Sequence, residues 1–263
     1  MPRRSLNGRV VAVTGAAGGL GRALVHAFIA RGARVAALDL DAAAMRDLPP
    51  GVLALACDIT DATACRAALG RVAGEFGGLD VLVNNAGISH RSLLARTEAA
   101  VIRRVMEVNF FGALNATQAA LPALAARGGA IVVISSVAGF APLAARSGYS
   151  ASKHALHGLF DTLRSELKAS CVDVLLACPS FIRTGIAQAH LGADGGPAQG
   201  PRTEVGGALD PEDVAARIVR ALEQGRERLL VGRVAWLSWW VSRLAPGTYA
   251  RIMAKRMRAE LGR

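Results

Sequence analysis

Cysteine, histidine and aromatic residues are scarce in this sequence. Four cysteines and five histidines occur in 263 residues, and aromatic residues make up 5%. No two cysteines have the C-x-x-C spacing of zinc clasps and redox pairs, and no Asp, Glu or Cys motif supplies further ligands for His154 and His157. We therefore expect no metal site, and we expect the cysteines to be reduced core residues: Cys57, Cys65, Cys171 and Cys178.

No signal peptide is recognisable, because the apolar run near the start is short and breaks at Gly15. Hydrophobic residues make up 52% of the chain and charged residues 19%, a balance that excludes a disordered protein. The length suits one domain over residues 1–263, without a visible linker. We therefore expect a single-domain cytoplasmic protein.

Acidic residues are outnumbered by basic residues, 20 to 31, which gives a formal net charge of +11. Much of this charge lies at the C-terminus, where residues 226–263 contain nine basic and two acidic residues. No basic stripe with interleaved aromatics crosses the rest of the chain, which argues against nucleic-acid binding. The basic terminus is either a solvated helical face or a contact for an acidic partner or an anionic membrane.

Short apolar runs alternate with longer segments of helical periodicity along most of the chain. The runs predict strands at residues 9–13, 34–39, 52–57, 81–84, 130–135, 173–178 and 229–231. The periodic segments predict helices at residues 20–30, 61–76, 97–126, 147–169 and 210–224. Such alternation is typical of an α/β fold: a doubly wound, Rossmann-like parallel sheet of about seven strands with helices on both faces. Ligand sites then lie beyond the carboxyl ends of the strands.

Two segments depart from this pattern. Residues 184–209 are crowded with Gly and Pro, and we interpret them as a mobile substrate lid. Residues 232–263 hold all three tryptophans and predict amphipathic, basic helices that are too short and too interrupted to span a bilayer. Two interpretations of these helices stay open. They pack on the subunit, covering the substrate cleft or a dimer interface, or they lie peripherally on the inner face of a membrane.

The loop after the first predicted strand is rich in glycine, with the pattern TGxxxGxG. It opens the first predicted helix, where free backbone N–H groups suit a pyrophosphate. Asp39 ends the second predicted strand, where a carboxylate accepts hydrogen bonds from ribose hydroxyls and repels a 2′-phosphate. The sequence therefore predicts a site for NAD rather than NADP, with these cofactor-binding residues: Thr14, Gly15, Gly19, Leu20, Gly21 and Asp39.

Two further strand ends carry polar residues at the same edge of the predicted sheet. Asp58 and Ile59 follow the third strand, and an Asn-Asn-Ala-Gly sequence follows the fourth. Either group could simply cap a helix, but their coincidence at one edge favours a binding role. We expect cofactor contacts from Asp58, Ile59, Asn85, Ala86 and Gly87.

Ser136, Tyr149 and Lys153 are the candidate chemical centre. Ser136 follows the fifth predicted strand, and Tyr149 comes thirteen residues later, four residues before Lys153. At that spacing Tyr149 and Lys153 share one face of a helix. A neighbouring ammonium should lower the phenol pKa from about 10, so that Tyr149 exchanges a proton with a substrate oxygen that Ser136 also binds. Lys153 is also placed to hold the nicotinamide ribose.

These motifs together resemble the short-chain dehydrogenase/reductase (SDR) family. The resemblance covers nearly the whole chain, from Gly8 to about Val231. The resemblance implies a fourth catalytic residue, Asn109, which would hold a water in a proton relay from Lys153. Tyr149 and Lys153 would then serve both the chemistry and the cofactor.

The segment after the sixth predicted strand follows the family less closely. The resemblance implies cofactor contacts from Pro179, Ile182 and Thr184. However, Ser180 stands where the family usually has glycine, which puts the local backbone conformation in question. We expect an altered shape without loss of binding.

Apolar residues near the chemical centre predict a hydrophobic substrate, such as a steroid, long-chain or aryl alcohol. The candidate substrate residues are His90, Phe140, Leu143 and Phe181. Our main hypothesis is an NAD-dependent oxidoreductase for a secondary alcohol or ketone, assembled as a homodimer or homotetramer. Two alternatives are a 3-oxoacyl reductase of lipid metabolism, which would usually use NADP, and a non-enzymatic dinucleotide-sensing binding protein.

Overall fold

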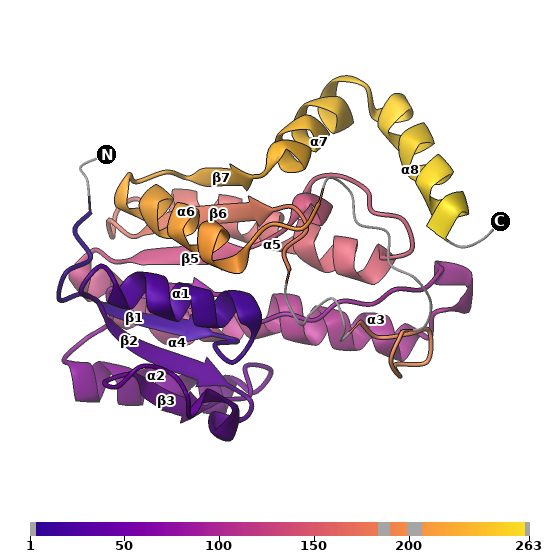
Figure 1. Cartoon of the computed structure of the whole chain (residues 1–263). Helices are drawn as coiled ribbons and strands as arrows, with labels where there is room; N and C mark the ends of the chain where they lie inside the picture. Colours follow the sequence, from indigo (N-terminus) through magenta and orange to yellow (C-terminus); the bar gives the residue numbers. More distant parts are fainter. Residues whose placement is uncertain (1–3, 184–189, 199–206, 261–263) are drawn as a thin grey trace.

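The computed structural model describes residues 4–183, 190–198 and 207–260, with side chains as far as residue 255. Within this part of the chain, seven strands form one sheet in the order β3-β2-β1-β4-β5-β6-β7. They are β1 (Val10–Thr14), β2 (Arg34–Asp39), β3 (Leu53–Ala56), β4 (Val81–Asn84), β5 (Ala130–Ile134), β6 (Asp173–Pro179) and β7 (Arg228–Val231). All neighbouring strands are parallel. The predicted doubly wound, Rossmann-like α/β fold is confirmed (Figure 1).

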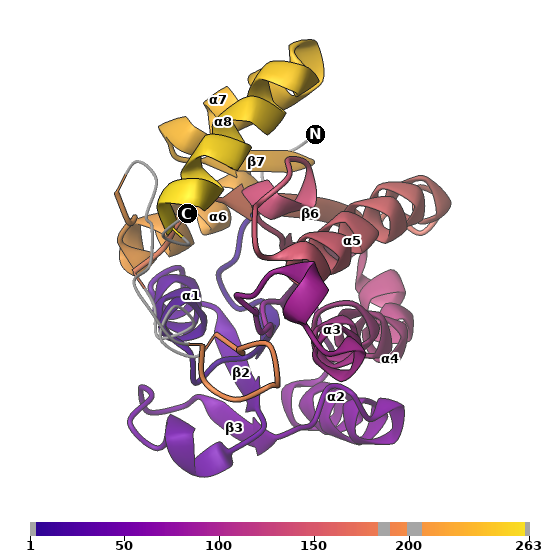
Figure 2. The ribbon, with the colours of Figure 1, turned by 90° about the vertical axis from the view of Figure 1, so that its right-hand side faces the viewer.

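Helices cover both faces of this sheet, because both sets of strand side chains are apolar. In β1, Val11 and Val13 enter one core while Val10 and Ala12 enter the other, as the twofold period of a strand requires. One face carries α1 (Gly19–Ile29) and α6 (Pro211–Glu223), and the other carries α2 (Ala62–Phe76), α4 (Gly112–Arg127) and α5 (Ser147–Glu166) (Figure 2). The loops at the strand ends are thus left free to carry chemistry.

The helix predicted over residues 97–126 is interrupted. The structure has α3 (Ala99–Met106), a π-helical turn at Glu107–Phe111, and then α4. A π turn contains one extra residue per hydrogen-bonded ring and often marks a functional position. Here the turn buries Asn109, of which 1% is exposed. The backbone stays helical through the turn, so the predicted helix is present, but the sequence did not predict a π turn at the residue that the family resemblance singles out.

The predicted lid, residues 184–209, lies mostly outside the described residues. Of its two described parts, residues 207–209 lie beside the segment after β6, and residues 190–198 are attached to the segment after β4. The backbone N–H of Leu191 donates to the carbonyl of Ser89 at 2.9 Å, and Arg91 N–H donates to Leu191 O at 2.8 Å. Mobility of the lid stays a prediction.

The C-terminal segment forms two helices, α7 (Arg233–Leu244) and α8 (Pro246–Glu260), which extend beyond the sheet in Figure 1. Trp239 of α7 packs edge-on against Phe140, with ring centroids 4.9 Å apart. Within the described residues, no helix combines the length and the apolar character needed to cross a membrane.

The cysteines do not all lie in the core. Cys57, Cys65 and Cys178 are buried, but Cys171 is exposed in the turn before β6, where its φ is +53°. The expectation of a core position was therefore wrong for Cys171, because the turn between α5 and β6 lies at the surface.

Candidate active site

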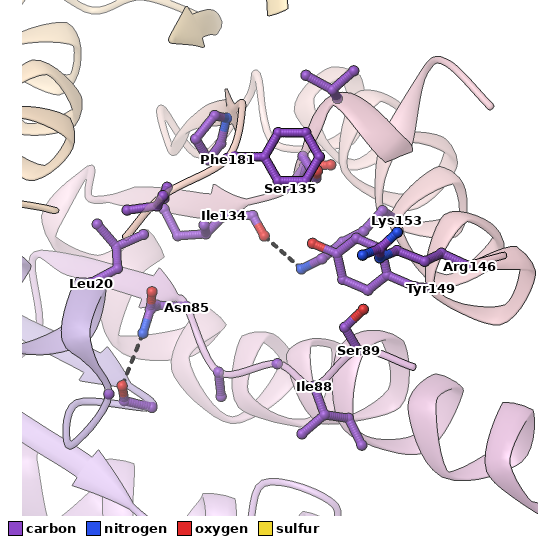
Figure 3. A pocket seen from close by; sticks show the side chains of 18 of the residues that line it. Leu20, Asn85, Ile88, Ser89, Ile134, Ser135, Arg146, Tyr149, Lys153 and Phe181 are labelled. Atoms are coloured by element: carbon purple, nitrogen blue, oxygen red, sulfur yellow. Dashed lines mark hydrogen bonds between the residues drawn. The ribbon is translucent and has the colours of Figure 1, made fainter. Parts of the chain in front are cut away.

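A cavity of about 890 Å³ lies at the carboxyl ends of the strands. The chain reverses its direction of travel across the sheet between β1 and β4, and such a switch point leaves a crevice between the loops that follow the two strands. Figure 3 shows Leu20 and Asn85 on one side of this cavity and Tyr149 and Lys153 on the other. The predicted cofactor and chemical centres therefore share one space.

The glycine-rich loop is joined to the loop after β4 by hydrogen bonds. The Thr14 hydroxyl accepts from the backbone N–H groups of Asn85 and Ala86, both at 3.1 Å. The Asn85 amide donates to the carbonyls of Thr14 and Gly15, at 2.9 and 3.0 Å. Thr14 itself is buried and does not line the cavity. Its side chain fixes the relative positions of the two loops.

Most of the predicted cofactor residues do line this end of the cavity. They are Gly15, Gly19, Leu20, Gly21, Asp39, Asp58, Ile59, Asn85, Ala86 and Gly87. The Asp39 carboxylate accepts from the backbone N–H of Ala17 at 2.9 Å and of Leu40 at 2.8 Å. A carboxylate has about four acceptor positions, so Asp39 retains capacity for hydroxyl groups in the cavity.

The chemical centre combines one loop residue, Ser136, with two residues of α5, Tyr149 and Lys153. Ser136 begins a short 3-10 turn, and its hydroxyl accepts from Ala138 N–H at 3.2 Å and also hydrogen-bonds to Tyr149. Lys153 lies one turn along α5, with its ammonium 5.7 Å from the centroid of the Tyr149 ring. It donates to the carbonyl oxygen of Ile134 at 2.8 Å (Figure 3). Ser136, Tyr149 and Lys153 all line the cavity.

The pKa of Tyr149 is raised, whereas the sequence analysis predicts that it is lowered. Burial raises the pKa of Tyr149 and outweighs the lowering effects of its hydrogen bond with Ser136 and of the Arg146 charge. The Lys153 ammonium, which bonds to Ile134 and lies 5.7 Å from the ring centroid, is not among the groups that lower the Tyr149 pKa. Burial also lowers the pKa of Lys153 to about 8. Burial therefore favours the neutral phenol at Tyr149, beside a lysine whose pKa is lowered by the same cause.

Asn109 connects the catalytic helix to the loop after β4. Its side-chain oxygen accepts from Ile88 N–H at 2.8 Å, and its amide donates to Ile88 O and to the Ser152 hydroxyl, both at 2.9 Å. A Cβ at Gly87 would lie 3.1 Å from the Asn109 oxygen and 3.6 Å from the Lys153 ammonium. Asn109 thus lies close to Lys153 without lining the cavity. Its part in a proton relay stays a prediction.

The predicted substrate residues divide into two groups. Leu143 and Phe181 line the cavity, whereas His90 and Phe140 do not. His90 is fully buried, and its Nε2 accepts from the Gly148 N–H at 2.9 Å, at the head of α5. Burial, together with the nearby Arg146 charge, lowers the pKa of His90. The structure therefore places His90 behind the site, as a support for the catalytic helix.

Two of the three residues after β6 that the resemblance assigns to the cofactor lie at the cavity. Pro179 and Ile182 line the cavity, and Thr184 lies outside the described residues. Among the described non-glycine residues, only Ala145 and Cys171 have positive φ, so Ser180 needs no glycine-like backbone.

Arg146 is a part of the cavity wall that the sequence analysis missed. It lines the cavity with 3% of its surface exposed, and its position three residues before Tyr149 was the available signal. The C-terminal segment also lines the cavity, as one of the two interpretations left open for residues 232–263 expects. It contributes Val234, Leu237, Ser238, Val241, Tyr249, Ile252 and Met253. The sequence did not indicate which residues of this segment face the cavity.

A glycine-rich loop and a Ser-Tyr-Lys centre in one cavity of a doubly wound sheet define a dinucleotide-dependent oxidoreductase. A family model described as short chain dehydrogenase matches residues 9–193. The chain belongs to the short-chain dehydrogenase family, whose members bind a nicotinamide dinucleotide and act on small molecules.

Individual relatives are similar over almost the whole chain. Dehydrogenase/reductase SDR family member 7B of Bos taurus is 36% identical, covering 98% of this chain and 84% of that protein. A short chain dehydrogenase from Burkholderia cenocepacia, solved in complex with NADP, has a TM-score of 0.83 and 28% identity, covering 95% of this chain and 99% of that one. An SDR from Burkholderia phymatum, solved in complex with NAD, has a TM-score of 0.83 and 26% identity, covering 93% of this chain and 96% of that one.

Proposed function

We propose that this protein transfers a hydride between NAD and a hydrophobic secondary alcohol or its ketone, with Tyr149 as the general acid and base. The observation that carries the proposal is the single cavity lined by the glycine-rich loop at one end and by Ser136, Tyr149 and Lys153 at the other.

The glycine-rich end fits a dinucleotide. A Cβ at Gly15 would lie 2.6 Å from the Ala86 Cα, and a Cβ at Gly21 would collide with the backbone of Gly15, so glycine is needed for the close packing that gives this loop its shape. Helix α1 begins at Gly19 with no acidic residue in its first turn, which suits a pyrophosphate. The bound nicotinamide would supply or accept the hydride at the substrate carbon.

The protein's own side chains would handle the proton. Tyr149 holds a proton at its hydroxyl and would donate it to the carbonyl oxygen in the reduction direction. Ser136, which hydrogen-bonds to Tyr149, would bind the same substrate oxygen and orient it. Lys153, with a pKa lowered to about 8, is the neighbouring group through which the proton would be replaced.

The substrate end of the cavity supports an apolar ligand. Leu143 and Phe181 line it beside the chemical centre, and the lining residues of α7 and α8 are mostly aliphatic or aromatic. A ligand whose apolar body contacts these side chains, with one hydroxyl or carbonyl at Tyr149, would match this distribution.

The proposal is tested by following NAD reduction spectroscopically with purified protein and a panel of steroid, aryl and long-chain secondary alcohols. We expect turnover of at least one apolar class, with NADP giving a lower kcat/KM than NAD. Turnover confined to 3-oxoacyl thioesters with NADP would instead favour the reductase alternative. Dinucleotide binding without turnover of any alcohol or ketone would favour a sensor.

Replacing Gly21 with Ala should weaken NAD binding. The new Cβ would lie 2.8 Å from the Ala16 Cα, and overpacking of this kind costs about 1–3 kcal/mol, which is roughly ten- to a hundredfold in affinity. Isothermal titration calorimetry with NAD measures the change. The matched control is Gly158→Ala on α5, where a Cβ meets nothing within 4 Å. Equal NAD affinity in the two variants would show that the loop does not hold the pyrophosphate.

Replacing Asp39 with Ala should reduce the preference for NAD over NADP. Loss of hydrogen bonds from ribose hydroxyls to a carboxylate costs about 1.5–3 kcal/mol, so the ratio of kcat/KM values should fall by roughly ten- to a hundredfold. Kinetics with both cofactors measure the ratio. Asp47→Ala, an exposed carboxylate paired with Arg22, is the control and should leave it unchanged. A wild-type protein that already prefers NADP would refute the assignment.

A further inference from the structure

The outer side of α7 carries an apolar surface that the described residues leave exposed. Trp236, Leu237, Trp240 and Leu244 are 57, 54, 45 and 77% exposed. The last three lie one, four and eight residues after Trp236, and this spacing places all four along one side of the helix. We call these four residues the α7 face. Exposed large apolar side chains grouped in this way mark an interaction site more often than a plain surface.

This face is held firmly to the rest of the molecule. On the opposite side of the helix, Ala235 and Ser238 are buried. Trp239 packs against Phe140, and the guanidinium groups of Arg228 and Arg243 lie 4.7 and 3.2 Å from the centroid of the Trp239 ring. The helix therefore presents a fixed apolar surface.

The α7 face is continuous with the catalytic cavity. Leu237 belongs to the face and also lines the cavity. Ile252 of α8 is 41% exposed and lines the cavity as well. Both residues thus border the outside surface and the space that leads to Tyr149, so a ligand leaving an apolar phase at this face would enter the cavity directly.

Charge identifies the partner. Residues 228–259 contain seven basic residues and no acidic residue. Arg233, three residues before Trp236, is exposed, as are Arg243, Arg251 and Lys255. Pairing with a second copy through this face would bring the same cations together, which disfavours it. An anionic lipid surface suits both the apolar and the basic side chains of this segment. Tryptophan and leucine enter the interface, while arginine and lysine contact the headgroups.

We propose that the α7 face docks this protein on membranes that contain anionic lipid, with the cavity opening toward the lipid. The part of this inference that concerns substrate delivery rests on the proposed function. An apolar alcohol dissolved in the membrane would then reach the cavity between Leu237 and Ile252.

The test is flotation of the full chain with vesicles of phosphatidylcholine, alone or mixed with phosphatidylglycerol. We expect flotation with the mixed vesicles, weaker at high salt. The double variant Trp236→Gln/Leu244→Gln should bind the mixed vesicles at least about tenfold more weakly, because two apolar anchors are removed. Leu94→Gln is the matched control, since Leu94 is 63% exposed and lies in a 3-10 turn before α3, outside the α7 face. Neither Trp236 nor Leu244 lines the cavity, and circular dichroism checks that the variants fold.

Two charge-reversal variants distinguish attraction to the headgroups from insertion of the apolar side chains. Arg233→Glu/Arg251→Glu should abolish the response to phosphatidylglycerol, whereas Arg217→Glu/Arg220→Glu, on the exposed side of α6, should keep it. Tryptophan fluorescence should be quenched by brominated lipid, because all three tryptophans lie on α7.

Flotation that is absent, or equal in all variants, would overturn the proposal. So would a stable dimer that the Trp236→Gln/Leu244→Gln variant converts to a monomer in sedimentation velocity, without any lipid binding by the wild type. Flotation requires no turnover, so an inactive protein that still binds these vesicles would count against the proposed function alone.

Discussion

Replacing Tyr149 with Phe should lower kcat/KM for the alcohol substrate by about 10²- to 10⁴-fold, the usual contribution of general acid-base catalysis. The phenyl ring keeps its volume, and the glycine-rich loop and Lys153 stay in place, so NAD affinity should fall far less than kcat/KM. The variant loses only the hydroxyl that hydrogen-bonds to Ser136 and holds the proton. Steady-state kinetics in both directions, with NAD affinity measured separately, distinguish loss of chemistry from loss of binding.

The second tyrosine of the chain provides a matched control. Tyr249 on α8 also lines the cavity, and Tyr249→Phe removes a hydroxyl from the same space. Its effect should be far smaller, because the residue comes from the apolar end and has no lysine one helical turn away. Full activity in Tyr149→Phe would eliminate the proposed mechanism, and equal losses in both variants would mean that the cavity, rather than the proton donor, is being perturbed.

Replacing Asp80 with Ala should destabilise the protein by about 1–3 kcal/mol, because the buried Val10 N–H loses its acceptor while the partly exposed Arg9 and Arg127 stay hydrated. Asp80 is fully buried just before β4. Its Oδ1 accepts from Arg9 at 2.7 Å and from Arg127 at 3.0 Å, and its Oδ2 accepts from Val10 N–H at 2.9 Å. One carboxylate thus joins the start of β1, the start of β4 and the end of α4. Urea unfolding measures the loss.

Glu75→Ala is the control for this change. Glu75 forms an exposed i, i+4 pair with Arg71 on α2, a type of pair that contributes only about 0.3–0.5 kcal/mol. A change in Asp80→Ala no larger than in Glu75→Ala would mean that the network does not stabilise the fold.

The same carboxylate should make stability depend on pH. Burial opposes ionisation of Asp80, but the hydrogen bonds from Arg127, Val10 and Arg9 prevail and hold its pKa below the ordinary value. The unfolded chain therefore binds this proton at a higher pH than the folded chain. The stabilisation is complete above the unfolded pKa of about 3.9 and is lost as the pH falls through the folded pKa. In Asp80→Ala this part of the acid-induced loss of stability should be missing.

Much of the site was predictable because its parts are local. The TGxxxGxG loop, Asp39 and the Asn-Asn-Ala-Gly turn each follow a strand directly, and parallel strands bring such ends to one edge. Tyr149 and Lys153 share a helix face by their spacing alone. The position of Ser136 beside them required only that β5 and α5 be neighbours in the fold.

Other parts depend on contacts that no local pattern encodes. The π turn at Asn109 is sustained by hydrogen bonds to Ile88 and Ser152, which are 21 and 43 residues away. The pKa of Tyr149 rises because surrounding chain segments exclude water from it, and a spacing of four residues to a lysine says nothing about that burial. His90 accepts a hydrogen bond from Gly148 at the start of α5. Its position shortly after β4 had instead suggested contact with the substrate.

The sequence by itself determined the sheet, the glycine-rich loop and the grouping of Tyr149 with Lys153, because periodicity, glycine and strand-end residues act within one strand-helix unit. Only the tertiary structure decided that Arg146 is buried at the chemical centre and that α7 and α8 form a cavity wall with an apolar outer face. Those positions result from packing between segments about 100 residues apart, where burial is set by the whole fold and not by the neighbouring residues.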